Sequence, residues 1–169
     1  VGWFNQAAAA AALWTAEQLT GPARAYLGSL APSTRAGAKR LVHGSVRDPV
    51  AEYITDVMVA AMSFESLEED VCFFGHTHVP AAYVHTPALG AGRLSGDVRQ
   101  ILPGDSGALE LAAGRRYLVN PGSIGLPFKR ARPGIMEVAP WAEYGLLKHE
   151  DGRVSMELRR TPYDVEAFL

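Results

Sequence analysis

The spacing of apolar and polar positions changes about halfway along the chain. Alanine and leucine dominate residues 6–19, which predicts a helix. A second helix is predicted over residues 20–30, with Thr20 as its cap and Pro22 in its first turn. Residues 31–39 are small and loop-forming, so the helical half is interrupted there.

A strand–helix–strand pattern comes next. The short apolar run "RLVHG", residues 40–44, predicts a buried strand. Residues 47–64 have apolar side chains at helical spacing behind Asp48 and Pro49, which predicts a helix capped by Asp48. "VCFFGHTH", residues 71–78, returns to a strand that runs into a loop. Two strands joined through a helix are expected to be parallel neighbours in one sheet.

The second half of the chain consists of short strand-like pieces separated by Gly, Pro and Asp turns. This order of elements predicts an α/β (α+β layered) fold, with residues 1–169 as a single domain around a central sheet. The predicted strands are 81–85, 98–102, 108–111, 115–120, 134–138, 143–150 and 153–160.

Composition narrows the possible partners. With 48% apolar and 20% charged residues in 169, the chain is typical of a globular domain. Its net charge of −2 gives no strong signal for nucleic acid, and no apolar run is long enough to span a membrane. The single cysteine, Cys72, excludes an internal disulfide and favours a cytoplasmic protein. Because Cys72 lies in an apolar run, we expect a buried structural thiol rather than a nucleophile.

Three of the five histidines share a context that suggests chemistry. His43 ends the first predicted strand, and His76 and His78 follow the second. The carboxyl ends of such strands meet at one edge of a sheet, and imidazole is a favoured ligand of divalent metals. An extended segment would point His76 and His78 to the same side, and Gly44 and Gly75 would allow close backbone approach.

The other titratable residues do not complete a two-metal site. His85 and His149 have no partner pattern and are predicted to be structural. Asp48 is assigned to a helix cap, and residues 68–70 to a solvated turn. The three clustered histidines therefore predict half of a metal site.

Four segments, taken in order, resemble the calcineurin-like metallophosphoesterase superfamily, and within it the small bacterial phosphodiesterase or phosphatase branch. The resemblance implies a β-sandwich flanked by helices. It also implies a metal-dependent phosphoesterase that hydrolyses phosphate mono- or diesters through a dinuclear metal centre and a metal-bridging hydroxide. The segments are "LVHGSVRDPVAEYI" (41–54), "FFGHTHVP" (73–80), "YLVNPGSIGLP" (117–127) and "MELRRTPYDVEAF" (156–168).

By this resemblance, His43 and His76 are ligands of one metal ion and His78 is a ligand of the other. Two divalent ions are implied, with Mn, Fe, Zn, Co and Ni all acceptable to such ligands. Arg47 follows the first motif and either faces a substrate phosphate or forms a salt bridge or helix-cap contact.

The "NPGS" segment resembles a loop that closes over the site. Asn120, Gly122 and Ser123 belong to it, and either a structural role or a substrate contact fits them. The basic run "FKRARP", residues 128–133, is expected to be a solvated loop, or else to attract anionic substrates.

The chain also departs from the superfamily pattern. The DxH, GD and GNHD or GNHE motifs that open a member do not occur, so the sequence resembles the C-terminal two-thirds of one. We expect weak or no activity from this chain alone on a phosphorylated small molecule or nucleotide. We also expect self-association or binding of an N-terminal segment. The alternatives are a non-catalytic scaffold of the same fold and a mononuclear structural zinc domain.

Overall fold

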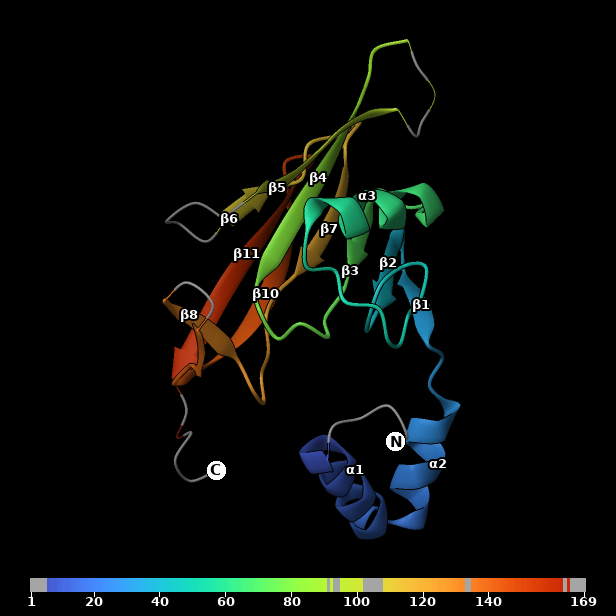
Figure 1. Cartoon of the computed structure of the whole chain (residues 1–169). Helices are drawn as coiled ribbons and strands as arrows, with labels where there is room; N and C mark the ends of the chain where they lie inside the picture. The colour runs from blue at the N-terminus through green and yellow to red at the C-terminus, as the bar shows by residue number, and fades with distance from the viewer. Residues whose placement is uncertain are drawn as a thin grey trace. The chain divides into compact units, whose positions relative to one another are not determined.

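The structure is a computed structural model that describes residues 6–90, 92, 95–101, 108–132, 135–162 and 164. It forms two compact units, Val1–Ala31 and Pro32–Leu169 (Figure 1). None of the described helices is long and apolar enough to cross a membrane. Several predicted positions lie outside the described residues: Leu102 and Gly134 at strand ends, Pro133 of the basic run, and Tyr163 and residues 165–168 of the last motif.

The first unit contains the two helices predicted at the start of the chain, α1 (Gln6–Gln18) and α2 (Gly21–Ser29). Thr20 caps α2 as expected, because its side chain accepts a hydrogen bond from the backbone N–H of Ala23 at 3.4 Å. Neither helix has a buried residue among those described. The large apolar side chains of this unit are exposed, namely Leu13, Trp14, Tyr26, Leu27 and Leu30.

The second unit is built on a sheet that has six strands in the described residues, in the order β1-β2-β3-β7-β4-β5. β2, β3 and β7 are parallel, and the other pairs are antiparallel, so the predicted parallel neighbours are confirmed. β1 was expected to be loop, but it pairs with β2 through a turn at Gly37. The strands are β1 (Ser33–Ala36), β2 (Lys39–Val42), β3 (Val71–Phe73), β4 (Ala81–Pro87), β5 (Gly96–Ile101) and β7 (Arg116–Asn120).

Two smaller sheets complete the described part of this unit. β10 (Trp141–Glu150), β11 (Arg153–Pro162) and β6 (Ala108–Glu110) pair in the order β10-β11-β6. β8 (Phe128–Arg132) and β9 (Ile135–Val138) form a two-stranded sheet. The expectation of a solvated loop at the basic run is therefore wrong for its first five residues, which form β8.

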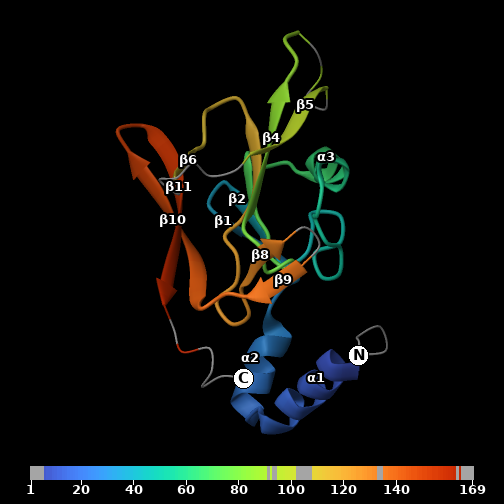
Figure 2. The same cartoon turned by 60° about the vertical axis from the view of Figure 1, so that its left-hand side comes forward.

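The larger sheet lies between a helix and the three-stranded sheet. α3 (Val57–Ser66) covers one face, and β10 and β11 lie on the other side (Figure 2). Side chains alternate along each strand, so β7 sends Leu118 toward α3 and sends Tyr117 and Val119 to the opposite cluster. The core on the α3 side includes Ile54, Phe64, Cys72, Phe74 and Tyr83, and the core between the sheets includes Val71, Val84, Leu111 and Met156.

The helix predicted for residues 47–64 is shorter than expected. α3 begins at Val57, and Asp56 caps it by accepting hydrogen bonds from two backbone N–H groups of the first turn. The prediction that Asp48 caps this helix is wrong. Its carboxylate instead accepts hydrogen bonds from the backbone N–H groups of Val50 and Ala51, which closes a separate turn. Both aspartates have the same local capping chemistry, so the sequence does not distinguish them. Residues 47–56 therefore form a loop beside the sheet edge instead of the first turns of the helix.

Candidate metal centre

His43 and His76 come together at the edge where β2 and β3 end. The backbone N–H of Gly75 donates to the carbonyl of His43 at 2.9 Å, which continues the strand pairing into the loops. His43 Nε2 lies 2.9 Å from His76 Nδ1. Two nitrogens bound to one ion at about 2.0–2.1 Å are about 3 Å apart when they subtend a right angle. The spacing therefore fits two ligands of one metal ion.

The electrostatic surroundings favour the neutral form of these two rings. Burial lowers the pKa of His43, and the nearby His78 lowers it further. Burial also lowers the pKa of His76, with His43 as the next cause, while the backbone of Ala51 opposes the shift. Nε2 of His76 is buried, although it has no hydrogen bond of normal geometry. A neutral imidazole offers a lone pair, which is the form that binds a metal.

His78 is oriented by the loop that follows β7. Its Nδ1 donates to the carbonyl of Leu126 at 2.8 Å, which leaves Nε2 as the nitrogen with a free lone pair. Backbone carbonyls commonly orient metal-binding histidines in this way, by accepting a hydrogen bond from the ring nitrogen that does not bind the metal. Ser123 holds that loop, because its hydroxyl accepts from the N–H of Leu126 and its carbonyl accepts from the N–H of Glu143.

The segment that carries these histidines is not extended. His76 has φ of 66° and His78 has φ of 57°, so both lie in the left-handed region. The expectation that an extended chain aligns the two rings is therefore wrong. Non-glycine residues in this region cost about 1 kcal/mol or more and persist only where their surroundings impose them.

Asn120 imposes part of this conformation from the end of β7. Its side chain is fully buried and donates to the carbonyl of Gly75 at 3.0 Å and to the hydroxyl of Thr77 at 2.9 Å. It also accepts from the N–H of Gly122 at 2.9 Å. Gly122 has φ of 101°, and a Cβ there would overlap the side chain of Glu143. These contacts give Asn120 and Gly122 a structural role in the turn that carries His76, and a substrate contact for this loop stays a prediction.

The loop after His43 is also closely packed. A Cβ on Gly44 would lie 2.7 Å from the carbonyl oxygen of Asp48, so the expected need for glycine there is confirmed. The carbonyl of Pro49 accepts from the N–H groups of both His43 and Gly44. Gly75 differs, because a Cβ there would meet His43 only at ordinary contact distance, 3.5 Å. Close approach therefore explains Gly44 but not Gly75.

Arg47 forms the salt bridge that was the alternative to a phosphate contact. Its guanidinium donates to both carboxylate oxygens of Glu52, and this pairing lowers the pKa of Glu52. The hydroxyl of Ser45 donates to the same carboxylate. A contact between Arg47 and a substrate phosphate stays a prediction, and it would require Arg47 to leave Glu52.

Tyr53 contributes a contact that the sequence did not indicate. Its ring stacks on His76 with a centroid distance of 3.7 Å and an interplanar angle of 19°. The helical spacing of its neighbours assigned Tyr53 to the face of a helix, whereas it lies in the loop before α3. No motif or spacing in the chain marks this contact.

The described residues do not contain a complete metal site. Across that part of the chain, no three His, Cys, Asp or Glu side chains are grouped so that they could hold one ion. His43 and His76 form a two-nitrogen pair, and His78 is oriented separately. The ligand roles of His43, His76 and His78 therefore stay predictions, although the donors present fit them.

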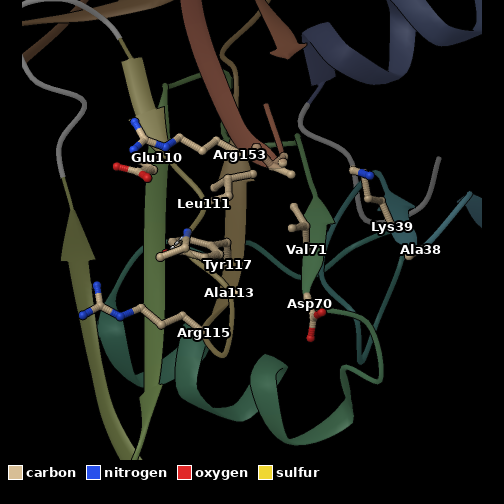
Figure 3. A pocket seen from close by; sticks show the side chains of 13 residues that line it. Ala38, Lys39, Asp70, Val71, Glu110, Leu111, Ala113, Arg115, Tyr117 and Arg153 are labelled. Carbon is tan, nitrogen blue, oxygen red and sulfur yellow. Dashed lines mark hydrogen bonds between the residues drawn. The ribbon is translucent and has the colours of Figure 1, made fainter. Parts of the chain in front are cut away.

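A cavity of about 300 Å³ lies at the opposite end of the parallel strands. Lys39 and Val71, the first residues of β2 and β3, line it together with Tyr117 of β7 and Arg153 of β11 (Figure 3). None of the predicted site residues is among its lining residues. Because sites of parallel sheets form at the carboxyl ends of the strands, the chemistry is assigned to the histidine edge.

Two residues given structural roles from the sequence have them. Cys72 is fully buried, and burial raises the pKa of its thiol to about 12. His85 is a buried, hydrogen-bonded structural histidine, as predicted. Arg116 donates to His85 Nδ1 at 3.2 Å and to the carbonyls of Phe64 and Leu67 at the end of α3.

No protein-family model and no curated protein matches the sequence. The structure is similar to the crystal structure of a metallophosphoesterase from Sphaerobacter thermophilus, with a TM-score of 0.70 and 34% sequence identity. The match covers 96% of this chain and 61% of the other, so this chain spans less than two-thirds of that protein. The fold is therefore metallophosphoesterase-like, as the sequence resemblance implied.

Proposed function

We propose that this chain belongs to a metal-dependent phosphoesterase of the calcineurin-like metallophosphoesterase superfamily and supplies the histidine part of its dinuclear metal centre. The observation that carries the proposal is the 2.9 Å approach of His43 Nε2 and His76 Nδ1 at the carboxyl ends of two parallel strands. The similarity to a solved metallophosphoesterase supports it.

In this proposal each imidazole has a separate task. His43 and His76 offer Nε2 and Nδ1 to one divalent ion, and His78 offers Nε2 to a second while its Nδ1 stays bonded to Leu126. Divalent ions bound there would supply Lewis-acid stabilisation of phosphate oxygens and lower the pKa of a water nucleophile. Asn120 holds the backbone turn that carries His76, and the loop after it accepts a hydrogen bond from His78 through Leu126. The substrate would be a phosphorylated small molecule or nucleotide.

A non-catalytic module of the same fold is the second candidate. It is favoured by one observation, namely that no three potential ligand side chains surround one point in the described residues. A pure scaffold, however, does not require a close pair of imidazoles beside a third imidazole that a backbone carbonyl orients.

Hydrolysis assays separate these candidates. The chain, and the longest product of its gene, would be stripped of metal, supplied with Mn²⁺, and assayed with p-nitrophenyl phosphate and bis(p-nitrophenyl) phosphate. We expect metal-dependent hydrolysis that is weak or absent in this chain alone and stronger in the longest product of its gene. It should be lost in His76→Ala and retained in His149→Ala, whose parent side chain is exposed on β10. Absence of metal-dependent hydrolysis in every form would contradict the enzyme and favour the module.

A further inference from the structure

We propose that Tyr53 is a positioning residue that holds the imidazole of His76 in the orientation in which Nδ1 faces His43. The inference rests on the proposed function, because it concerns how the metal-binding pair is pre-arranged. Tyr53 touches neither substrate nor metal in this proposal, and it acts only through His76.

The geometry of Tyr53 is that of a support. Its ring lies nearly parallel to the imidazole, at 3.7 Å and 19°, although 52% of the residue is exposed. An aromatic side chain that is half in solvent gains little free energy from burial, so burial alone does not explain why its ring stacks on His76. The stack covers one face of the imidazole and leaves Nδ1 at the edge directed at His43.

Besides the stack, Nδ1 of His76 lies 2.9 Å from His43 Nε2, and the backbone of Ala51 acts on the same ring. The contact with His43 is lost when both nitrogens bind an ion, so it cannot hold the ring for metal binding. Asn120 and Thr77 bind the backbone around His76, and Gly75 binds the backbone of His43. These bonds impose the left-handed backbone but leave rotation about the Cβ–Cγ bond open, and this torsion has a broad energy well. A flat ring packed against the face blocks that rotation.

Tyr53 is itself held by its neighbours in sequence. Glu52 accepts hydrogen bonds from Ser45 and Arg47, so the residue before it is anchored in the loop. Ile54, the residue after it, is 1% exposed and packs in the core on the α3 side of the sheet. These contacts fix the backbone at Tyr53, and from that position its ring stacks on His76.

The test compares Tyr53→Leu, which keeps apolar bulk but removes the flat ring, with Tyr53→Phe, which keeps the ring. Met58→Ala is the matched control, because Met58 is 73% exposed in the same stretch and has no aromatic ring that could stack on an imidazole. Each chain would be titrated with Co²⁺ and followed by visible absorption, with the unfolding midpoint of the metal-free chain measured alongside. We expect roughly tenfold weaker Co²⁺ binding in Tyr53→Leu, as when other side chains that orient a metal ligand are replaced, with little change in Tyr53→Phe or the control.

A second readout needs no metal. Nitrogen resonances of the His76 imidazole in the metal-free chain distinguish a fixed ring from one that exchanges between orientations. They should match the parent chain in Tyr53→Phe and move toward averaged values in Tyr53→Leu.

The outcomes separate this inference from the proposed function. Unchanged Co²⁺ affinity and unchanged His76 resonances in Tyr53→Leu would overturn the role of Tyr53. Equal losses in Tyr53→Phe and Tyr53→Leu would overturn it too, because the hydroxyl rather than the ring would then matter. If the parent chain itself binds no Co²⁺, the proposed function fails, and the metal-free His76 resonances still decide the role of Tyr53.

Discussion

Replacing Asn120 with alanine tests how the site is held. The change removes a fully buried side chain that makes three hydrogen bonds, to the carbonyl of Gly75, the hydroxyl of Thr77 and the N–H of Gly122. Gly75 and Thr77 keep other partners in the same turn. Gly122 loses the partner described for its N–H group. The variant therefore loses three hydrogen bonds and, with them, the restraint on the turn that carries His76.

The magnitude follows from these contacts. Three hydrogen bonds at about 1 kcal/mol each, with a further 1 kcal/mol or so for the unpaired N–H of Gly122, give a loss of about 4 kcal/mol. For a chain of this size, 1 kcal/mol corresponds to about 2–4 °C in the unfolding midpoint, so the midpoint should fall by roughly 10 °C.

Urea unfolding followed by circular dichroism measures this loss, with thermal unfolding as a second determination. Ser123→Ala is the matched control in the same loop, because the hydroxyl of Ser123 accepts one described hydrogen bond, from Leu126. We expect a loss of about 1 kcal/mol there. If Asn120→Ala loses no more free energy of unfolding than Ser123→Ala, Asn120 does not hold the site.

Three further changes test other parts of the structure. Gly122→Ala should lower the free energy of unfolding by about 3 kcal/mol in urea, since its φ is 101° and the new Cβ would overlap Glu143. Cys72, with a buried thiol whose pKa is raised to about 12, should resist an aromatic disulfide reagent at pH 8 until the chain is unfolded. Burial and Arg116 lower the pKa of His85, so below about pH 6.5 the unfolded chain takes up a proton that the folded chain does not. The free energy of unfolding should therefore fall between pH 7 and pH 5, and it should fall less in His85→Gln.

Each of these three predictions has a control variant or an outcome that would contradict it. Gly152 also has positive φ, 75°, but a Cβ there meets open space, so Gly152→Ala should cost only about 1 kcal/mol. Equal losses at Gly122 and Gly152 would exclude the overlap with Glu143. Rapid labelling of Cys72 in the folded chain would show that the core opens easily. Parallel pH profiles for His85→Gln and the parent chain would remove His85 as a source of the pH dependence.

The sequence predicts the sheet edge well, because that edge depends on local patterns. Two short apolar runs around a helix predict parallel neighbours, and β2 and β3 are paired in that way. His43 directly follows β2 and His76 lies three residues beyond β3, so strand pairing brings both to the same edge of the sheet. The sequence does not predict where α3 starts. Asp48 and Asp56 both have capping chemistry, and tertiary packing selects Asp56.

The contacts that shape the site depend on residues far apart in the chain. Asn120 fixes a turn 45 residues earlier, and no local rule indicates that its amide donates to Gly75. The left-handed conformation of His76 and His78 is imposed by such contacts, whereas their spacing suggested an extended segment. Tyr53 looked like part of a helix face for the same reason. These features require the folded backbone, because each is a tertiary effect that overrides a local preference.

The sharing of one ion by His43 and His76 is the central claim, and a calorimetric titration with Co²⁺ tests it most directly. The metal-free chain would be compared with His43→Ala, His76→Ala and the double variant. Two ligands of the same ion should not act additively, so the double variant should lose little more affinity than either single variant. Independent, additive losses, or variants that bind Co²⁺ as tightly as the parent chain, would contradict a shared ion.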